Sequence, residues 1–306
     1  MNRLIATLLG LIVCVSGAQA AAFIGIDYGP FHVSGQHPSS PVPIQQLTSD
    51  LATLSTKFGY IKTYGVDSES NLDKIVPIAA TSYPNLKIYQ GVFENTSYNS
   101  SANTAYLDKA ISLANQYPKT VAAVVVGNEC LSTDSNPDPV TVQQLIKDLQ
   151  YVRSRLKKGS KVKVTTGLGY AAANKYGQKL LPYVDSIMVN IYPFYAQVSI
   201  NQAMSNLRSA YQGFKAKFPG KPVLIGETGW PSDGGANGAA VPSVANEKTY
   251  TQGVYRNASR LGSTFIFSAF DEPWLSVQNS WGPHWGLWNS DGTPKFTFTA
   301  GKGLRR

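Results

Sequence analysis

The sequence predicts an α/β fold, a single closed (β/α)8 barrel with its active-site cleft at the C-terminal ends of the strands. Short runs rich in β-branched residues alternate with longer amphipathic stretches along the chain, and eight such runs can be counted. This alternation implies parallel strands joined by right-handed helical crossovers. No Gly-x-Gly-x-x-Gly segment follows the first run, so the main support for a dinucleotide-binding sheet is missing.

Each predicted strand is a short run of aliphatic, aromatic or β-branched residues. The runs cover residues 23–26, 60–64, 86–89, 121–126, 162–166, 186–190, 223–225 and 264–267. The amphipathic stretches between them predict helices over residues 44–58, 72–80, 105–116, 142–156, 202–218 and 246–261. The stretch 171–181 is shorter and is the weakest helix prediction. Thr141 and Ser199 stand where N-caps are expected.

The first twenty residues have the pattern of a cleavable secretory signal peptide. Arg3 supplies the positive charge, residues 4–15 are apolar, and Ala18-Gln19-Ala20 fits a small-x-small cleavage site. We therefore expect residues 1–20 to be removed and the protein to be secreted or periplasmic. Residues 21–306 contain no linker-like segment and predict one catalytic domain. No segment is long and apolar enough to predict insertion into a membrane.

Composition limits the partners and cofactors that are expected. The net charge is +9, but the Lys and Arg residues are scattered, and the cluster at 153–163 is typical of a solvated helix end. We therefore expect no nucleic acid partner and a monomer. No metal-ligand spacing is present, so neither a metal nor another cofactor is expected. Cys130 could be a nucleophile, but with so few histidines to activate it a small buried filler is the favoured interpretation.

Two of the predicted buried strands each lead into a glutamate. Gly127-Asn128-Glu129 follows the fourth run, and Gly226-Glu227 follows the seventh. The C-terminal ends of the strands meet at one mouth of a (β/α)8 barrel, so the two carboxylates are expected to face each other there. A pair of carboxylates is the minimum for cutting a glycosidic bond, and a gap of about 5 Å would suit double displacement.

Other polar and aromatic residues crowd the same predicted rim. They are Asp27, Tyr28, Tyr64, Gln90, Asn128, Asn190, Tyr192, Trp230, Asp271, Glu272 and Trp274. Aromatic faces stack on the C–H side of a sugar ring, while carboxylates and amides bind its hydroxyls. Asn128 could bind the sugar 2-hydroxyl, a contact that strengthens in the transition state.

Two segments resemble the signatures of a known enzyme family. Residues 126–129 (Val-Gly-Asn-Glu) and 226–232 (Gly-Glu-Thr-Gly-Trp-Pro-Ser) are similar to those of glycoside hydrolase family 17. Its members are retaining β-1,3-glucanases and β-1,3-glucan glucosyltransferases on a (β/α)8 barrel. The resemblance covers nearly all of residues 21–298 and is closer to the fungal and bacterial branch. It extends to residues 24–29, 61–65, 190–194, 269–274 and 284–287.

The resemblance implies roles for individual residues. Glu129 would be the acid/base and Glu227 the nucleophile. The donor side of the cleft would be lined by Tyr28, Tyr64, Asn128, Tyr192 and Trp230, with further sugar contacts from Glu272 and Trp274. Two positions depart from the family pattern: Leu275 replaces a basic residue, and Lys62 replaces an arginine. A bidentate ion pair behind the site is therefore expected to be missing.

The resulting prediction is a retaining hydrolase that cleaves β-1,3-glucan. The main alternative is a glucosyltransferase that uses the same catalytic pair to elongate or branch the glucan. Trp274 and the loop with Trp281, Trp285 and Trp288 favour transfer if their rings bind an acceptor sugar; equally, the loop could be packing. A non-catalytic glucan-binding protein and a hydrolase of cellulose or mannan are two further alternatives.

Overall fold

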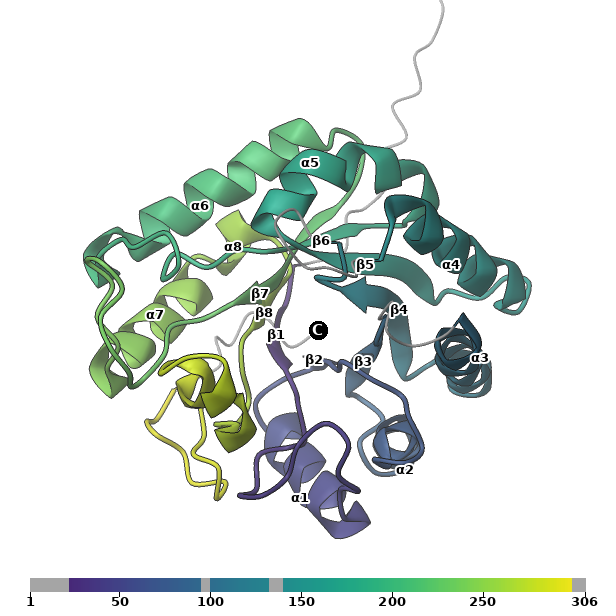
Figure 1. Cartoon of the computed structure of the whole chain (residues 1–306), viewed down its shortest axis with the longest axis horizontal. Coiled ribbons are helices and arrows are strands. Elements are labelled where there is room, and N and C mark those ends of the chain that lie inside the picture. The colour runs from purple at the N-terminus through teal and green to yellow at the C-terminus, as the bar shows by residue number, and fades with distance from the viewer. Residues whose placement is uncertain (1–21, 95–99, 132–139, 299–306) are drawn as a thin grey trace, which may run out of the picture.

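A closed barrel of eight parallel strands, paired in chain order, forms the centre of the molecule (Figure 1). The computed structural model describes residues 22–94, 100–131 and 140–298. The predicted fold class is confirmed, whereas the predicted signal peptide lies outside the described residues. The strands are β1 Ile24–Asp27, β2 Tyr60–Lys62, β3 Lys87–Val92, β4 Val121–Asn128, β5 Lys163–Gly169, β6 Ile187–Asn190, β7 Val223–Thr228 and β8 Thr264–Ile266.

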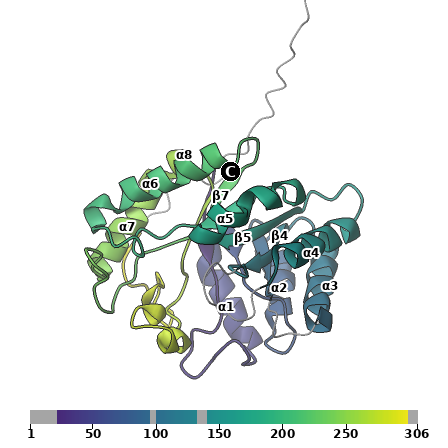
Figure 2. The ribbon, with the colours of Figure 1, turned by 45° about the horizontal axis from the view of Figure 1, so that its top comes forward.

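Helices surround the barrel on the outside (Figures 1 and 2). They are α1 Ile44–Ser55, α2 Ile75–Ser82, α3 Ser100–Gln116, α4 Val142–Arg155, α5 Tyr170–Leu180, α6 Ile200–Lys217, α7 Val244–Arg256 and α8 Ala258–Leu261. The weakest predicted helix is therefore present as α5. The helix predicted over 246–261 is interrupted at Asn257, which separates α7 from α8.

Local capping explains where two of these helices begin. The Thr141 side chain accepts a hydrogen bond from the backbone N–H of Gln144 at the start of α4. Ser199 and Gln202 form a capping box at the start of α6. Each cap satisfies backbone donors that the first turn of a helix leaves unpaired, so both predicted N-caps are confirmed.

The N-terminal end of the barrel is filled by apolar side chains. Phe23, Val125, Met188, Leu224 and Phe265 form a buried cluster there, joined by Tyr60 and Tyr89. The Phe23 and Tyr60 rings stack with their centroids 3.7 Å apart. All of them except Val125, which lies further along β4, stand at or near the beginnings of strands, so the cluster seals the end of the barrel opposite the predicted cleft.

A second, larger core lies between the strands and the helices. In α1, for example, Leu47, Leu51 and Leu54 are fully buried. Their spacing of four and three residues places them on one face of the helix, which packs against the barrel. This apolar layer fixes the strands whose C-terminal ends carry the candidate site.

After β8 the chain crosses the rim of the barrel and returns to its beginning. The short 3-10 turns Pro273–Val277 and Gly282–His284 lead into a segment whose Phe298 ring contacts those of Phe58, Tyr255 and Trp288. The His32 ring nitrogen Nδ1 lies 2.7 Å from the Ser290 carbonyl oxygen. In Figure 1 this yellow segment accordingly lies beside the purple loop that precedes α1.

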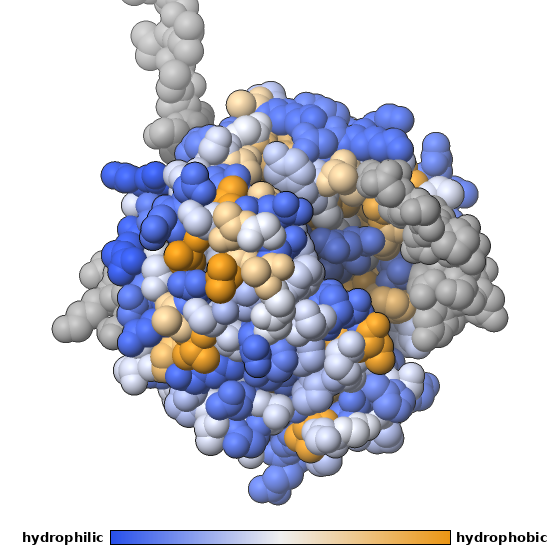
Figure 3. Space-filling view, turned by 60° about the vertical axis from the view of Figure 1, so that its left-hand side comes forward, coloured by the Kyte–Doolittle hydropathy of each residue, from blue (hydrophilic) through white to orange (hydrophobic). Residues whose placement is uncertain are grey.

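The surface carries no large apolar face on the side shown in Figure 3, where hydrophobic residues form small groups among hydrophilic ones. The described helices are all too short or too polar to span a bilayer.

Candidate active site

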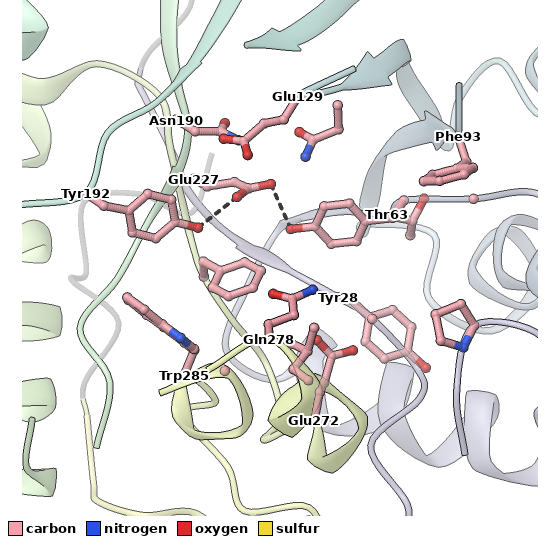
Figure 4. A pocket seen from close by; sticks show the side chains of 18 of the residues that line it. Tyr28, Thr63, Phe93, Glu129, Asn190, Tyr192, Glu227, Glu272, Gln278 and Trp285 are labelled. Atoms are coloured by element: carbon pink, nitrogen blue, oxygen red, sulfur yellow. Dashed lines mark hydrogen bonds between the residues drawn. The ribbon is translucent and has the colours of Figure 1, made fainter. Parts of the chain in front are cut away.

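A large cleft of about 1570 Å³ opens at the C-terminal end of the barrel. Its walls come from the ends of the strands and from the loops that follow them. Most of the predicted site residues line it: Tyr28, Tyr64, Asn128, Glu129, Tyr192, Glu227, Glu272 and Trp274. Figure 4 shows that Glu129 and Glu227 point into the same space, which brings together residues from distant parts of the chain.

Glu227, near the end of β7, is held by hydrogen-bond donors on both carboxylate oxygens. Its Oε1 accepts from Lys62 Nζ at 2.8 Å and from the Tyr64 hydroxyl at 3.0 Å. Its Oε2 accepts from the Tyr192 hydroxyl at 2.7 Å, as the dashed lines in Figure 4 indicate. Donors that converge in this way stabilise the ionised form of a carboxyl group and fix its orientation.

Lys62 is a buried cation at the end of β2. Its Nζ lies 3.3 Å from Asp27 Oδ1 and donates to Asn128 Oδ1 at 3.3 Å, in addition to its bond with Glu227. Burial lowers the pKa of Lys62, but Asp27 and Glu227 together raise it by more than burial lowers it. The pKa of Lys62 therefore lies above its ordinary value. The arginine fork is absent, as expected, and one ammonium instead contacts three acceptors on three different strands.

Glu129 follows β4 and occupies a different environment. Its backbone has a φ of 53°, in the left-handed region, and its N–H donates to the Gly167 carbonyl. The Asn190 side chain donates to Glu129 Oε1 at 2.8 Å. Although Glu129 is exposed at the mouth of the cleft, desolvation by the surrounding walls and the charge of Glu227 raise the pKa of Glu129 to about 6, while Asn190 and Lys62 oppose the rise. Non-glycine residues in this backbone region are concentrated at functional sites.

Two glycines leave room for the amide side chains of Asn190 and Asn128 in the site. A Cβ on Gly226 would lie 2.6 Å from Asn190 Oδ1, and one on Gly167 would lie 2.4 Å from Asn128 Oδ1. Both distances are far below van der Waals contact, so any larger residue would push the amides away. Gly226 in the predicted signature segment is therefore explained by packing against Asn190.

Aromatic side chains line other parts of the cleft. They include Phe93, Tyr170, Tyr195, Phe267 and Trp285. Of the three tryptophans in the loop after β8, Trp285 reaches the cleft, whereas Trp288 packs in the core. Trp281 packs against Phe194 and donates its indole N–H to the Gly235 carbonyl. The loop is thus partly packing and partly cleft wall.

Glu272 adds a further carboxyl group to the cleft, on the side opposite Glu129 (Figure 4). Burial raises its pKa to about 7, and Trp274 and His32 only partly oppose this rise. A neutral carboxyl group can donate a hydrogen bond as well as accept one, which suits a sugar hydroxyl.

One predicted site residue is misplaced. Trp230 does not line the cleft: it is 1% exposed, its Nε1 donates to the Val241 carbonyl, and its ring packs against Phe194 and Tyr250. The prediction that it contacts sugar is therefore wrong. Tyr28 does border the cleft, but its ring is buried and its hydroxyl already donates to Asp50 Oδ2 at 2.7 Å.

Cys130 is half-buried, and its thiol has the properties of an unreactive one. Burial, with a smaller contribution from Glu94, raises its pKa to about 12, which leaves almost no nucleophilic thiolate near neutral pH. Across the described parts of the chain, no group of three or more His, Cys, Asp or Glu side chains is arranged to hold a metal ion.

Two residues that contact the candidate catalytic carboxyl groups, Asn190 and Lys62, are not among the site residues predicted from the sequence. Asn190 was recognised only as one of several polar strand ends, yet it contacts Glu129 directly. Lys62 was noted only as a departure from a pattern, although a lysine at the end of a short buried strand is itself a signal. A buried charge requires a partner, and here two of the three partners, Asn128 and Glu227, line the cleft.

A parallel barrel with two carboxyl groups in different environments, set in a cleft lined by aromatic rings, defines a class: enzymes of the glycoside hydrolase type. The chain belongs to the BtgE/BtgC glycoside hydrolase domain family, whose model matches residues 25–286.

Named relatives and a solved structure agree with this family. A protein of Arthroderma benhamiae named glucan 1,3-beta-glucosidase is 29% identical, over 95% of both chains. A probable beta-glucosidase btgE of Neosartorya fischeri is 31% identical over 85% of this chain, which spans only 46% of that relative. The structure of a Rhizomucor miehei beta-1,3-glucanosyltransferase active-site mutant in complex with laminaritriose has a TM-score of 0.74 and 28% identity. The matched region covers 91% of this chain and 98% of the Rhizomucor miehei chain.

Proposed function

We propose that this protein is a retaining glycoside hydrolase that cleaves β-1,3-linked glucan by double displacement. Glu227 is the nucleophile and Glu129 the acid/base. The observation that carries the proposal is the contrast between the two carboxyl groups. Lys62, Tyr64 and Tyr192 donate hydrogen bonds to Glu227, whereas desolvation in the cleft and the charge of Glu227 raise the pKa of Glu129 to about 6. Two carboxyl groups with such different environments are suited to separate acid and nucleophile roles.

The chemistry takes place in two steps. In the first, a Glu227 oxygen attacks the anomeric carbon while Glu129 gives its proton to the departing glycosidic oxygen. In the second, Glu129 accepts a proton from the incoming acceptor, which attacks the anomeric carbon and releases Glu227. Asn128 precedes Glu129 in the chain and accepts a hydrogen bond from the Lys62 ammonium that also contacts Glu227, so it is suited to hold the sugar 2-hydroxyl during these steps.

Proximity of the two carboxyl groups supports retention rather than inversion. Asn190, which donates to Glu129, is the partner of Glu227 in the pairing of β6 with β7. The charge of Glu227 also contributes to the raised pKa of Glu129. Retaining enzymes hold their two carboxyl groups about 5 Å apart, closer than inverting enzymes do.

The names of the relatives support the substrate. Both the Arthroderma benhamiae protein and the Rhizomucor miehei enzyme are named for 1,3-linked β-glucan. The cleft is also lined by aromatic and polar residues, which is the lining expected of a site that binds a sugar chain. The first twenty residues support export, and we place the catalytic domain at residues 21–306.

Transfer to a second sugar is the alternative to hydrolysis. The solved relative is a glucanosyltransferase, and Trp274, Trp285 and Tyr195 line the cleft as rings on which an acceptor sugar could stack. Both outcomes share the first step, so only the acceptor distinguishes them.

Product analysis tests the proposal. Laminarin and laminari-oligosaccharides should be cleaved, and carboxymethyl cellulose and mannan should not. Shortened products alone indicate hydrolysis, whereas products longer than the substrate indicate transfer. Proton NMR of the first product should show the β-anomer, because two displacements retain configuration. An α-anomer would rule out the retaining mechanism.

The variant Glu227→Gln separates an enzyme from a glucan-binding protein. Turnover should fall by at least about three orders of magnitude. Binding of a laminari-oligosaccharide, measured by calorimetry, should persist. Unchanged turnover would show that Glu227 is not the nucleophile.

A further inference from the structure

Asp27 is another carboxyl group close to the proposed nucleophile Glu227, on the far side of Lys62. Asp27, at the end of β1, is 0% exposed, and its Oδ1 lies 3.3 Å from Lys62 Nζ. The same ammonium lies 2.8 Å from Glu227 Oε1. Among the described residues, the Asp27 oxygens have no hydrogen-bond donor apart from this ion pair. The buried cation therefore stands between two carboxyl groups, only one of which faces the cleft.

We propose that Asp27 and Lys62 form a positioning pair in which Asp27 keeps a counter-charge on Lys62 when Glu227 is consumed as nucleophile. Asp27 thereby sets the balance between formation and breakdown of the glycosyl-enzyme. This inference rests on the proposed role of Glu227 and adds to it a residue that never touches the substrate.

The charge balance of the first step gives the reason. A Glu227 oxygen forms the new bond to the anomeric carbon. The glycosidic C–O bond breaks, and its electron pair stays on the leaving oxygen, which takes the Glu129 proton. Glu227 thus changes from an anion to a neutral ester, and Lys62 loses one of its two carboxylate partners.

A buried ammonium left without a partner is costly. Removing one member of a buried ion pair is strongly destabilising, because it leaves an uncompensated charge in the interior. Asp27 avoids that cost in the intermediate because it remains 3.3 Å from Lys62. In the free enzyme Asp27 also competes with Glu227 for the ammonium, so Lys62 orients the nucleophile without neutralising it fully.

The protonation behaviour of Asp27 is consistent with this role. Burial raises its pKa well above the ordinary value, Lys62 opposes the rise, and the charges of Glu227 and, to a smaller extent, Glu272 add to it. When Glu227 becomes an ester, its contribution disappears. The negative charge on Asp27 is then more stable, at the stage at which Lys62 needs it.

The test measures the two half-reactions separately in Asp27→Asn, which keeps the shape of the side chain and removes its charge. The probe is 2,4-dinitrophenyl 2-deoxy-2-fluoro-β-laminaribioside, whose leaving group needs no proton. Intact-mass spectrometry follows labelling of the enzyme, and then its reactivation after excess probe is removed. The matched control is Asp73→Asn, another buried aspartate paired with lysines, Lys74 and Lys109, but outside the cleft.

The two rates should move in opposite directions in Asp27→Asn. Labelling should slow by about tenfold or more, because the developing ester leaves Lys62 unpaired. Reactivation should become faster, because it restores the anion that Lys62 needs. The control should match the wild type in both rates. Parallel slowing of both steps, or unchanged rates, would overturn the inference while leaving the proposed function intact.

Two further outcomes remain decisive. If the wild type is not labelled, the role of Glu227 fails and this inference fails with it. If Asp27→Asn does not fold, Lys62→Gln gives the mirror test. Without the cation, Asp27 and Glu227 are neighbouring negative charges and the ester removes their repulsion, so the ratio of labelling rate to reactivation rate should rise above that of the wild type. A ratio that stays equal or falls would overturn the inference.

Discussion

The two ends of the barrel are built from the same strands but contain opposite chemistry. Phe23 and Tyr60, next to or at the beginnings of β1 and β2, stack on each other in an apolar plug. Asp27 and Lys62, at the ends of the same strands, form a buried ion pair. The comparison shows how one short strand can serve both stability and chemistry. Burial of the apolar end stabilises the fold, whereas the buried charges at the polar end offset part of that stabilisation.

The largest effect is expected at the polar end. Glu129→Gln keeps the side-chain shape but cannot donate a proton, so turnover of laminarin should fall by roughly 100- to 10,000-fold. A dinitrophenyl β-laminaribioside should be far less affected in its first step, because its leaving group needs no protonation. Burst kinetics with both substrates would check this. Glu69→Gln, which changes an exposed carboxylate at the edge of the same cleft, is the control and should change little.

A substitution in the apolar plug should affect folding instead. Phe265 is fully buried between Phe23 and Tyr89, so Phe265→Ala should lower the free energy of unfolding by about 3–5 kcal/mol. Its kcat/KM, measured well below the melting temperature, should stay within about threefold of the wild type, because the two ends are energetically separate.

Phe267 offers the matched comparison, two residues along the same segment. It lines the cleft, so Phe267→Ala should reduce kcat/KM by about tenfold through lost ring contact. Chemical denaturation and steady-state kinetics of both variants would decide. If Phe265→Ala lost activity as strongly as Phe267→Ala, the proposed division between the two ends would be wrong.

A smaller effect is expected in the pH profile. Glu129 must be protonated to act as the acid, and its pKa is about 6, so kcat/KM on glucan should fall as the pH rises through about 6. Asn190 lowers that pKa by donating to the carboxylate. Asn190→Ala should therefore move the alkaline limb to higher pH, as well as reduce the rate. A shift to lower pH would contradict this reading of the contact.

The smallest effect is expected at Cys130, next to Glu129. The residue is half-buried and its thiol, with a pKa raised to about 12, is protonated, so Cys130→Ser should change kcat by less than about threefold. An equal loss in Cys130→Ser and Glu129→Gln would revive the thiol as a nucleophile.

The alternation of strand and helix patterns along the sequence, together with the residues at the strand ends, was enough to predict the fold and the two candidate catalytic glutamates. Each predicted strand run overlaps an observed strand, because apolar β-branched runs and amphipathic stretches are local properties of the sequence. Glu129 and Glu227 could be located because each follows such a run. Both line one cleft, as the rule that strand ends meet at one mouth predicts.

The errors arose where direction in space mattered. Trp230 lies three residues after Glu227, but beyond the strand the chain turns, and the indole points into the layer beside Tyr250. Asn190 and Trp285 gained their positions from pairing between strands and from a loop that folds back over the rim. Such contacts depend on long-range register, which no local pattern in the sequence specifies.

The returning segment after β8 has a consequence for biosynthesis. Lys295 Nζ lies 2.7 Å from Asp271 and 2.6 Å from Ser232 Oγ, and Phe298 packs against rings from the region before β2 and the end of α7. The stretch that carries Glu272 is thus fastened by residues translated more than twenty positions later. A ribosome-bound chain could therefore complete most of its strands and still be inactive. Competence for sugar chemistry should arrive abruptly, once these last residues have left the exit tunnel.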